Sequence, residues 1–136
     1  MAFLLDTNVV SETRRGGPNA NVLRWFASVD SDDLYISALV LGEVRQGIER
    51  LRPRAPERAA EFEAWLDTLE RDYTDRIVPI TAEVADEWGR LNARKPLPVI
   101  DSLLAATARV HGWTLVTRNR KDVEPTGVDL VDPFAD

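Results

Sequence analysis

The chain has 136 residues, 44% of them apolar, a net charge of −6 and no cysteine. These values predict a single domain over residues 1–136, and they exclude disulfides, thiolate zinc sites and cysteine nucleophiles. The negative charge argues against a nonspecific binder of duplex DNA, and no apolar run approaches the length of a membrane span.

Short apolar runs alternate with longer amphipathic segments along the chain. The runs predict strands at residues 2–5, 34–36, 77–78, 114–116 and 129–131. Capping residues and apolar residues at helical spacing predict helices over 7–14, 20–29, 38–51, 56–73, from 82 onward behind the N-cap Thr81, and over 99–110. Strands that alternate with helices indicate a three-layer α/β domain with a central, mainly parallel sheet of about five strands.

The start of the chain also carries information about location. Met1 to Leu5 runs straight into Asp6 and lacks the basic and long apolar regions of a secretory signal. We therefore expect a cytoplasmic protein with no membrane partner.

Four acidic residues stand at positions where an α/β sheet commonly forms a site. Asp6 and Asp122 follow predicted strands, Asp101 opens the last predicted helix, and Glu43 borders the buried face of its own helix. Each has an ordinary alternative role: a helix cap for Asp6 and Asp101, a solvated side chain for Glu43, and a turn former for Asp122. Because these positions map to one sheet edge, we interpret the acids as one cluster.

Clustered carboxylates require a counter-charge, and a divalent cation with a preference for oxygen ligands supplies it. Mg²⁺ is the expected cofactor, with Mn²⁺ as an alternative. The chain has one histidine, His111, which excludes a histidine-pair ribonuclease mechanism, and it has no glycine-rich phosphate loop. Any phosphodiester chemistry would therefore depend on metal and carboxylates.

Four stretches together resemble the motifs of PIN-domain proteins, in order and over nearly the whole chain. They are LLDTNVVS at residues 4–11, SALVLGEVRQG at 37–47, IDSLLAATA at 100–108, and GWTLVTRN at 112–119 with Asp122. Within that family the chain is similar to VapC toxins of the FitB-like group, the nucleases of toxin–antitoxin pairs.

The resemblance implies a PIN fold and Mg²⁺- or Mn²⁺-dependent endoribonuclease activity. It also implies a homodimer and a cognate antitoxin, in a heterotetramer or larger assembly. Asp6, Glu43 and Asp101 would be the metal-binding acids, while Asn8 and Thr117 would hold water, phosphate or other side chains. We further expect part of the stripe that carries Trp65 and Tyr73 to form a dimer or antitoxin surface.

One position departs from the family pattern. Many members carry an acid where this chain has Asn119, and an amide adds no charge. Either Asn119 or Asp122 would complete the site, and we expect a single Mg²⁺ held mainly by Asp6 and Asp101.

The expected reaction is attack of an activated water on the scissile phosphate, which leaves 5′-phosphate and 3′-hydroxyl ends. Basic side chains near the acids are candidates to hold RNA phosphates: Arg14, Arg15, Arg118, Arg120 and Lys121.

Two alternatives stay open. One is a PIN domain that binds RNA with impaired catalysis. The other is a phosphatase or phosphotransfer domain that uses Asp6 as its nucleophile, although Asn8 occupies the place of the second acid in a haloacid-dehalogenase-like pattern.

Overall fold

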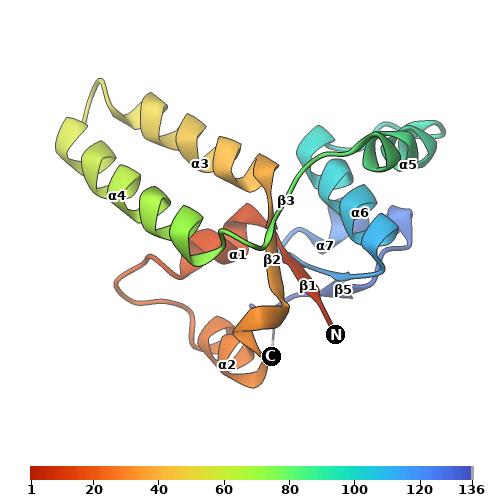
Figure 1. Cartoon of the computed structure of the whole chain (residues 1–136), viewed down its shortest axis with the longest axis horizontal. Coiled ribbons are helices and arrows are strands. Elements are labelled where there is room, and N and C mark those ends of the chain that lie inside the picture. The colour runs from red at the N-terminus through yellow and green to blue at the C-terminus, as the bar shows by residue number, and fades with distance from the viewer. Residues whose placement is uncertain (136) are drawn as a thin grey trace.

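The computed structural model describes residues 1–135, which form a parallel sheet with helices on both faces (Figure 1). The five strands lie in the order β3-β2-β1-β4-β5, and every neighbouring pair is parallel. Their bounds are β1 Phe3–Leu5, β2 Leu34–Ser37, β3 Ile77–Val78, β4 Thr114–Val116 and β5 Leu130–Val131. The α/β architecture and all five predicted strands are therefore confirmed.

Several helices begin or end at the capping residues that the sequence predicts. Ser37 accepts a hydrogen bond from the Leu39 backbone N–H at 3.1 Å, and Thr81 accepts one from that of Val84 at 3.2 Å. Gly112 ends its helix in the left-handed region at φ 70°, which glycine adopts without a Cβ clash. The helices are α1 Thr7–Glu12, α2 Ala20–Ser28, α3 Ala38–Leu51, α4 Pro56–Asp72, α5 Ala82–Asn92, α6 Val99–His111 and α7 Arg120–Val123, with 3₁₀ turns at Ser31–Asp33 and Glu124–Thr126.

The central strand β1 divides the apolar core into two clusters. Phe3 and Leu5 pack on one face with residues of α1, α3 and α4, while Leu4 packs on the other with residues of α6 and α7. Successive side chains of a strand point to opposite faces, so three apolar residues in a row serve both layers. This explains why β1 is apolar throughout and why Asp6 emerges at the middle of the sheet edge.

Helices α3 and α4 pack against each other as an antiparallel pair that extends to one side of the sheet (Figure 1). Arg45 of α3 and Arg52, which follows the end of α3, both contact Glu63 of α4, each at 2.6 Å. Trp65 and Tyr73 are half-buried and pack against the core cluster that contains Phe3 and Leu5. Internal packing therefore accounts for much of the apolar stripe on which these two residues lie.

Helix α5 packs on α6, and the Trp88 indole N–H donates to the Ser102 hydroxyl at 2.9 Å. Among residues 1–135, none of the helices combines the length and apolar character that a bilayer crossing requires.

Candidate active site

Asp6 lies at the carboxyl end of β1 and is almost completely buried, with 4% of its surface exposed. Its Oδ1 accepts a hydrogen bond from the Thr7 backbone N–H at 2.6 Å, so Asp6 also caps α1. Burial raises the pKa of the Asp6 carboxyl, and the negative charge of Glu43 raises it further, while the bonds from Thr117 and Thr7 oppose the shift. The capping role and the position expected of a site acid therefore coincide in one residue.

Thr117 and Asn8 hold Asp6 from the neighbouring strand end and from α1. The buried Thr117 hydroxyl donates to Asp6 Oδ2 at 2.6 Å, and the Asn8 amide donates to the same oxygen at 3.3 Å. Asn8 Oδ1 also accepts from the backbone N–H of Arg118 at 3.3 Å. These contacts tie the loop after β4 to the acid at the end of β1.

Glu43 reaches the same edge from α3. Its Oε1 accepts a hydrogen bond from the Thr7 hydroxyl at 2.5 Å, which joins two elements 36 residues apart in the chain. Gly47, one turn on, has open space where a Cβ would lie, so the approach to Glu43 is not blocked from that side. Thr7 lies inside the first motif, but its place in the sequence gives no sign of this contact.

Asp101 is the third residue of α6 and lies in its first turn, while the N-cap position is held by Pro98 and has no side-chain cap hydrogen bond. Burial raises its pKa to about 6, and the negative charges of Asp6, Asp122 and Glu43 add to the rise, while a hydrogen bond from the Asn119 side chain lowers it. Asp6, Glu43 and Asp122 thus all act on Asp101 across the carboxyl edge of the sheet, and Glu43 acts on Asp6 as well. Such mutual repulsion is the electrostatic state that a bound cation relieves.

Asn119 and Asp122 differ in how they reach Asp101. The Asn119 side chain lowers the pKa of the Asp101 carboxyl, whereas the charge of Asp122, exposed on the short α7, raises it. The Arg118 guanidinium lies over the Phe134 ring at 4.6 Å from its centroid, while the Arg118 backbone contacts Asn8. Arg120 and Lys121 follow on α7, where both are exposed.

The donor set fits a hydrated Mg²⁺ better than a cage of protein ligands. In residues 1–135, no three acidic or histidine side chains stand close enough together to form a complete metal-binding group. Mg²⁺ usually keeps several waters and is held by one or two carboxylates. Asp6, oriented by three hydrogen bonds, and Asp101, repelled by its acidic neighbours, are the two carboxylates best suited to hold it.

Comparison with known proteins gives similarities along nearly the whole chain. The PIN-domain family model matches residues 3–124. Toxin FitB of Neisseria gonorrhoeae is 30% identical over 98% of this chain and 99% of its own length. The VapC ribonuclease Y4jK of Sinorhizobium fredii is 29% identical over 97% of each. The crystal structure of FitAcB from Neisseria gonorrhoeae superposes with a TM-score of 0.86 at 29% identity, over 97% of this chain and 98% of that one.

Proposed function

The chain belongs to the PIN-domain family, and from this premise we propose that it is a Mg²⁺-dependent endoribonuclease, the toxin of a toxin–antitoxin pair. Relatives that cover almost its full length are named a toxin and a VapC ribonuclease. The observation that carries the proposal is that Asp101 lies partly buried within reach of the charges of Asp6, Asp122 and Glu43: burial first, and then these charges, raise its pKa to about 6. A cognate antitoxin and a second copy of the chain are the partners that this function implies.

The residues of the site have distinct tasks in this proposal. Asp6 and Asp101 hold the cation, and Glu43 completes the acidic surface. Thr117 and the Thr7 backbone fix the orientation of Asp6, while the Thr7 hydroxyl fixes that of Glu43. When bound, the cation supplies positive charge to the phosphoryl oxygens and promotes attack by water. The water oxygen bonds to phosphorus, the P–O3′ bond breaks, and the products carry 5′-phosphate and 3′-hydroxyl ends.

The two alternatives fit the geometry less well. Both oxygens of Asp6 accept hydrogen bonds and the side chain is 4% exposed, which disfavours Asp6 as a nucleophile in a phosphatase. A domain that only binds RNA would gain nothing from the repulsion around Asp101, because that repulsion costs stability and attracts no RNA.

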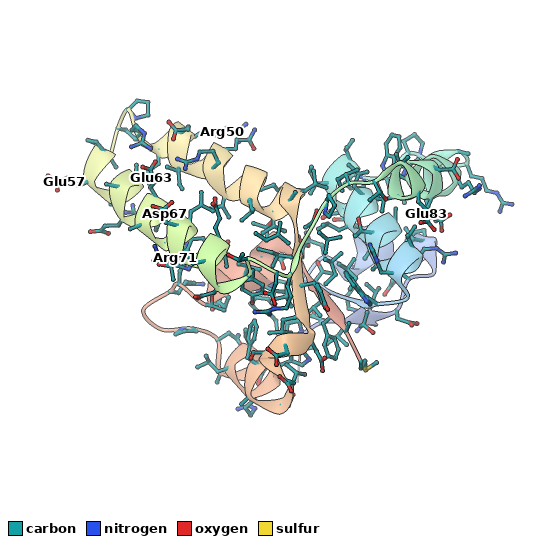
Figure 2. All side chains as sticks on the ribbon, in the orientation of Figure 1. Arg50, Glu57, Glu63, Asp67, Arg71 and Glu83 are labelled. Atoms are coloured by element: carbon teal, nitrogen blue, oxygen red, sulfur yellow. The ribbon has the colours of Figure 1, made fainter. Side chains whose placement is uncertain are left out.

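The test is cleavage of a defined single-stranded RNA pool by purified protein with Mg²⁺, with EDTA, and with Asp6→Asn. We expect cleavage only by the unaltered protein with Mg²⁺. Glu83→Gln is the matched control, since it removes an exposed carboxylate on α5, away from the site (Figure 2). Equal cleavage in EDTA, or products with 2′,3′-cyclic phosphates, would overturn the proposal.

A further inference from the structure

A groove opens beside Glu43, between α1, α3 and the start of α4. Its volume is about 370 Å³, within the size range of sites that bind small molecules or single residues of a polymer. We call it the arginine groove and define it by Arg14, Arg54, Arg58, Phe62 and Trp65, all of which line it. At one end the groove shares Thr7 and Glu43 with the proposed catalytic site. Its other lining residues have no role in the proposed chemistry.

The three arginines of the groove carry uncompensated charge. Within residues 1–135, none of Arg14, Arg54 and Arg58 lies within ion-pair distance of a carboxylate. Elsewhere on the same helix pair, by contrast, Arg45 and Arg52 are held by glutamates at 2.6–3.2 Å. A chain with net charge −6 therefore places three unpaired positive charges along this groove, where an anion would be attracted.

Two of these cations, Arg14 and Arg58, lie over aromatic rings. The Arg14 guanidinium is 4.3 Å from the ring centroid of Phe62 and 5.9 Å from that of Trp65, and that of Arg58 is 5.6 Å from Phe62. Phe62 and Trp65 are both half-buried, so part of each ring is exposed to solvent. Stacking rings combined with guanidinium groups are what single-stranded nucleic acids bind: bases stack on the rings and phosphates contact the arginines.

The groove is continuous with the proposed catalytic end of the sheet. Thr7 and Glu43, which hydrogen-bond to each other at the site, line the same cavity as Arg14 and Trp65. An RNA strand that crosses Asp6 and Asp101 has to leave the acidic cluster in some direction. The arginine groove offers it a route where positive charge replaces negative charge.

We propose that the arginine groove binds the single-stranded RNA segment that flanks the scissile phosphate on one side, with a base stacked on Phe62 or Trp65 and backbone phosphates on the arginines. This rests on the proposed function for the identity of the polymer. An acidic polypeptide would also satisfy the arginines. The opening toward the catalytic acids and the stacked cation–aromatic arrangement favour RNA as the occupant.

The experiment measures binding separately from cleavage. A 5′-fluorescein-labelled, unstructured 12-nucleotide RNA is titrated with protein in EDTA, and anisotropy gives the dissociation constant at several salt concentrations. The test variants are Arg14→Gln/Arg58→Gln and Trp65→Leu. The matched control is Arg50→Gln/Arg71→Gln, which removes the same charge from exposed positions on α3 and α4 outside the groove; Figure 2 shows Arg50 directed away from α4.

We expect the double arginine variant to raise the dissociation constant about tenfold and to reduce the slope of log K against log salt by about 1.4, since each phosphate contact on a single strand contributes about 0.7. Trp65→Leu should raise it about tenfold and remove the quenching of tryptophan fluorescence by RNA. The control pair should change it less than twofold. Because both arginines are exposed, their variants report on the groove even where Trp65→Leu unfolds.

The outcomes separate the two proposals. Equal RNA affinity of groove and control variants, in protein that cleaves RNA with Mg²⁺, would overturn the groove assignment alone and would leave a polypeptide as the better occupant. Failure of the unaltered protein to bind RNA would also overturn the groove assignment. Groove-dependent binding without any cleavage would refute the nuclease function and support the groove.

Discussion

Replacing Asp101 with asparagine should stabilise the metal-free protein while it inactivates the enzyme. Burial and the charges of Asp6, Asp122 and Glu43 all disfavour the ionised form of Asp101, whose pKa rises to about 6 from the ordinary 3.8. Asparagine has nearly the same shape and carries no charge, so it removes this repulsion. It also removes a proposed cation ligand, and we expect cleavage to fall by a factor of about 100 or more.

The size of the stability gain follows from the raised pKa. A rise of about two pH units corresponds to about 3 kcal/mol at 1.36 kcal/mol per unit. Because the side chain is partly exposed, solvent screening reduces the expected gain to about 1 kcal/mol. For a chain of 136 residues that corresponds to a rise in Tm of about 4 °C.

The gain in stability from Asp101→Asn should depend on pH in a way that identifies its electrostatic cause. An acid whose folded pKa lies above its unfolded pKa stabilises the protein most when it is protonated in both states. That stability is lost as pH rises from 3.8 to about 6. The advantage of Asp101→Asn should therefore be full at pH 7 and should disappear as pH falls toward 4.

The assay is thermal unfolding followed by circular dichroism in EDTA, at several pH values between 4 and 7. The control is Asp67→Asn, which removes one exposed carboxylate on α4, away from the site (Figure 2), and should shift Tm by no more than about 2 °C. A variant less stable than the parent at pH 7, or a gain that does not change with pH, would refute the electrostatic reasoning.

Three further changes test other parts of the structure. Thr117→Val removes the 2.6 Å hydrogen bond to Asp6 and should cost about 1–3 kcal/mol in urea unfolding and lower cleavage at least tenfold; unchanged cleavage would show that this bond does not position the acid. Asn119→Asp places another carboxylate beside Asp101, so calorimetry should show tighter Mg²⁺ binding and urea unfolding a less stable metal-free protein; weaker Mg²⁺ binding would place Asn119 outside the ligand set. Leu104→Ala, at a fully buried position, should cost about 2–5 kcal/mol in urea unfolding, and a loss below 1 kcal/mol would contradict its place in the core.

Most of the fold was predictable because its signals are local. Buried parallel strands require short apolar runs, and the helices carry their own caps in Ser37, Thr81 and Gly112. The end of α1 was set by a contact that spacing does not reveal. Buried Glu12 accepts a hydrogen bond from the Asn19 backbone N–H at 2.8 Å, and the helix ends there and not at Arg14. Helix α7, with four residues, is too short to show any periodicity.

The site was only partly predictable, for a related reason. Strand ends fix which residues reach the sheet edge, so Asp6 was expected there. Which hydroxyls contact which acids depends on the packing of elements distant in sequence, as in the bond from Thr7 to Glu43. Spacing alone also left Asn119 and Asp122 as equal candidates. In the structure both act on Asp101: Asn119 lowers the pKa of its carboxyl and the charge of Asp122 raises it, so which of the two completes the site stays a prediction.

Net charge proved a weaker guide than the distribution of charge. The value of −6 argues against nonspecific binding of duplex DNA, but it says little about one groove on one face. Outside the groove, glutamates neutralise Arg45 and Arg52, whereas Arg14 and Arg58 in the groove have no such partner within residues 1–135. Salt screens charges that lie farther from a phosphate than the Debye length of about 10 Å. The electrostatic potential at a phosphate in the groove therefore depends mainly on the nearby unpaired arginines and little on distant acids. An acidic protein can therefore bind a polyanion where its arginines are left uncompensated.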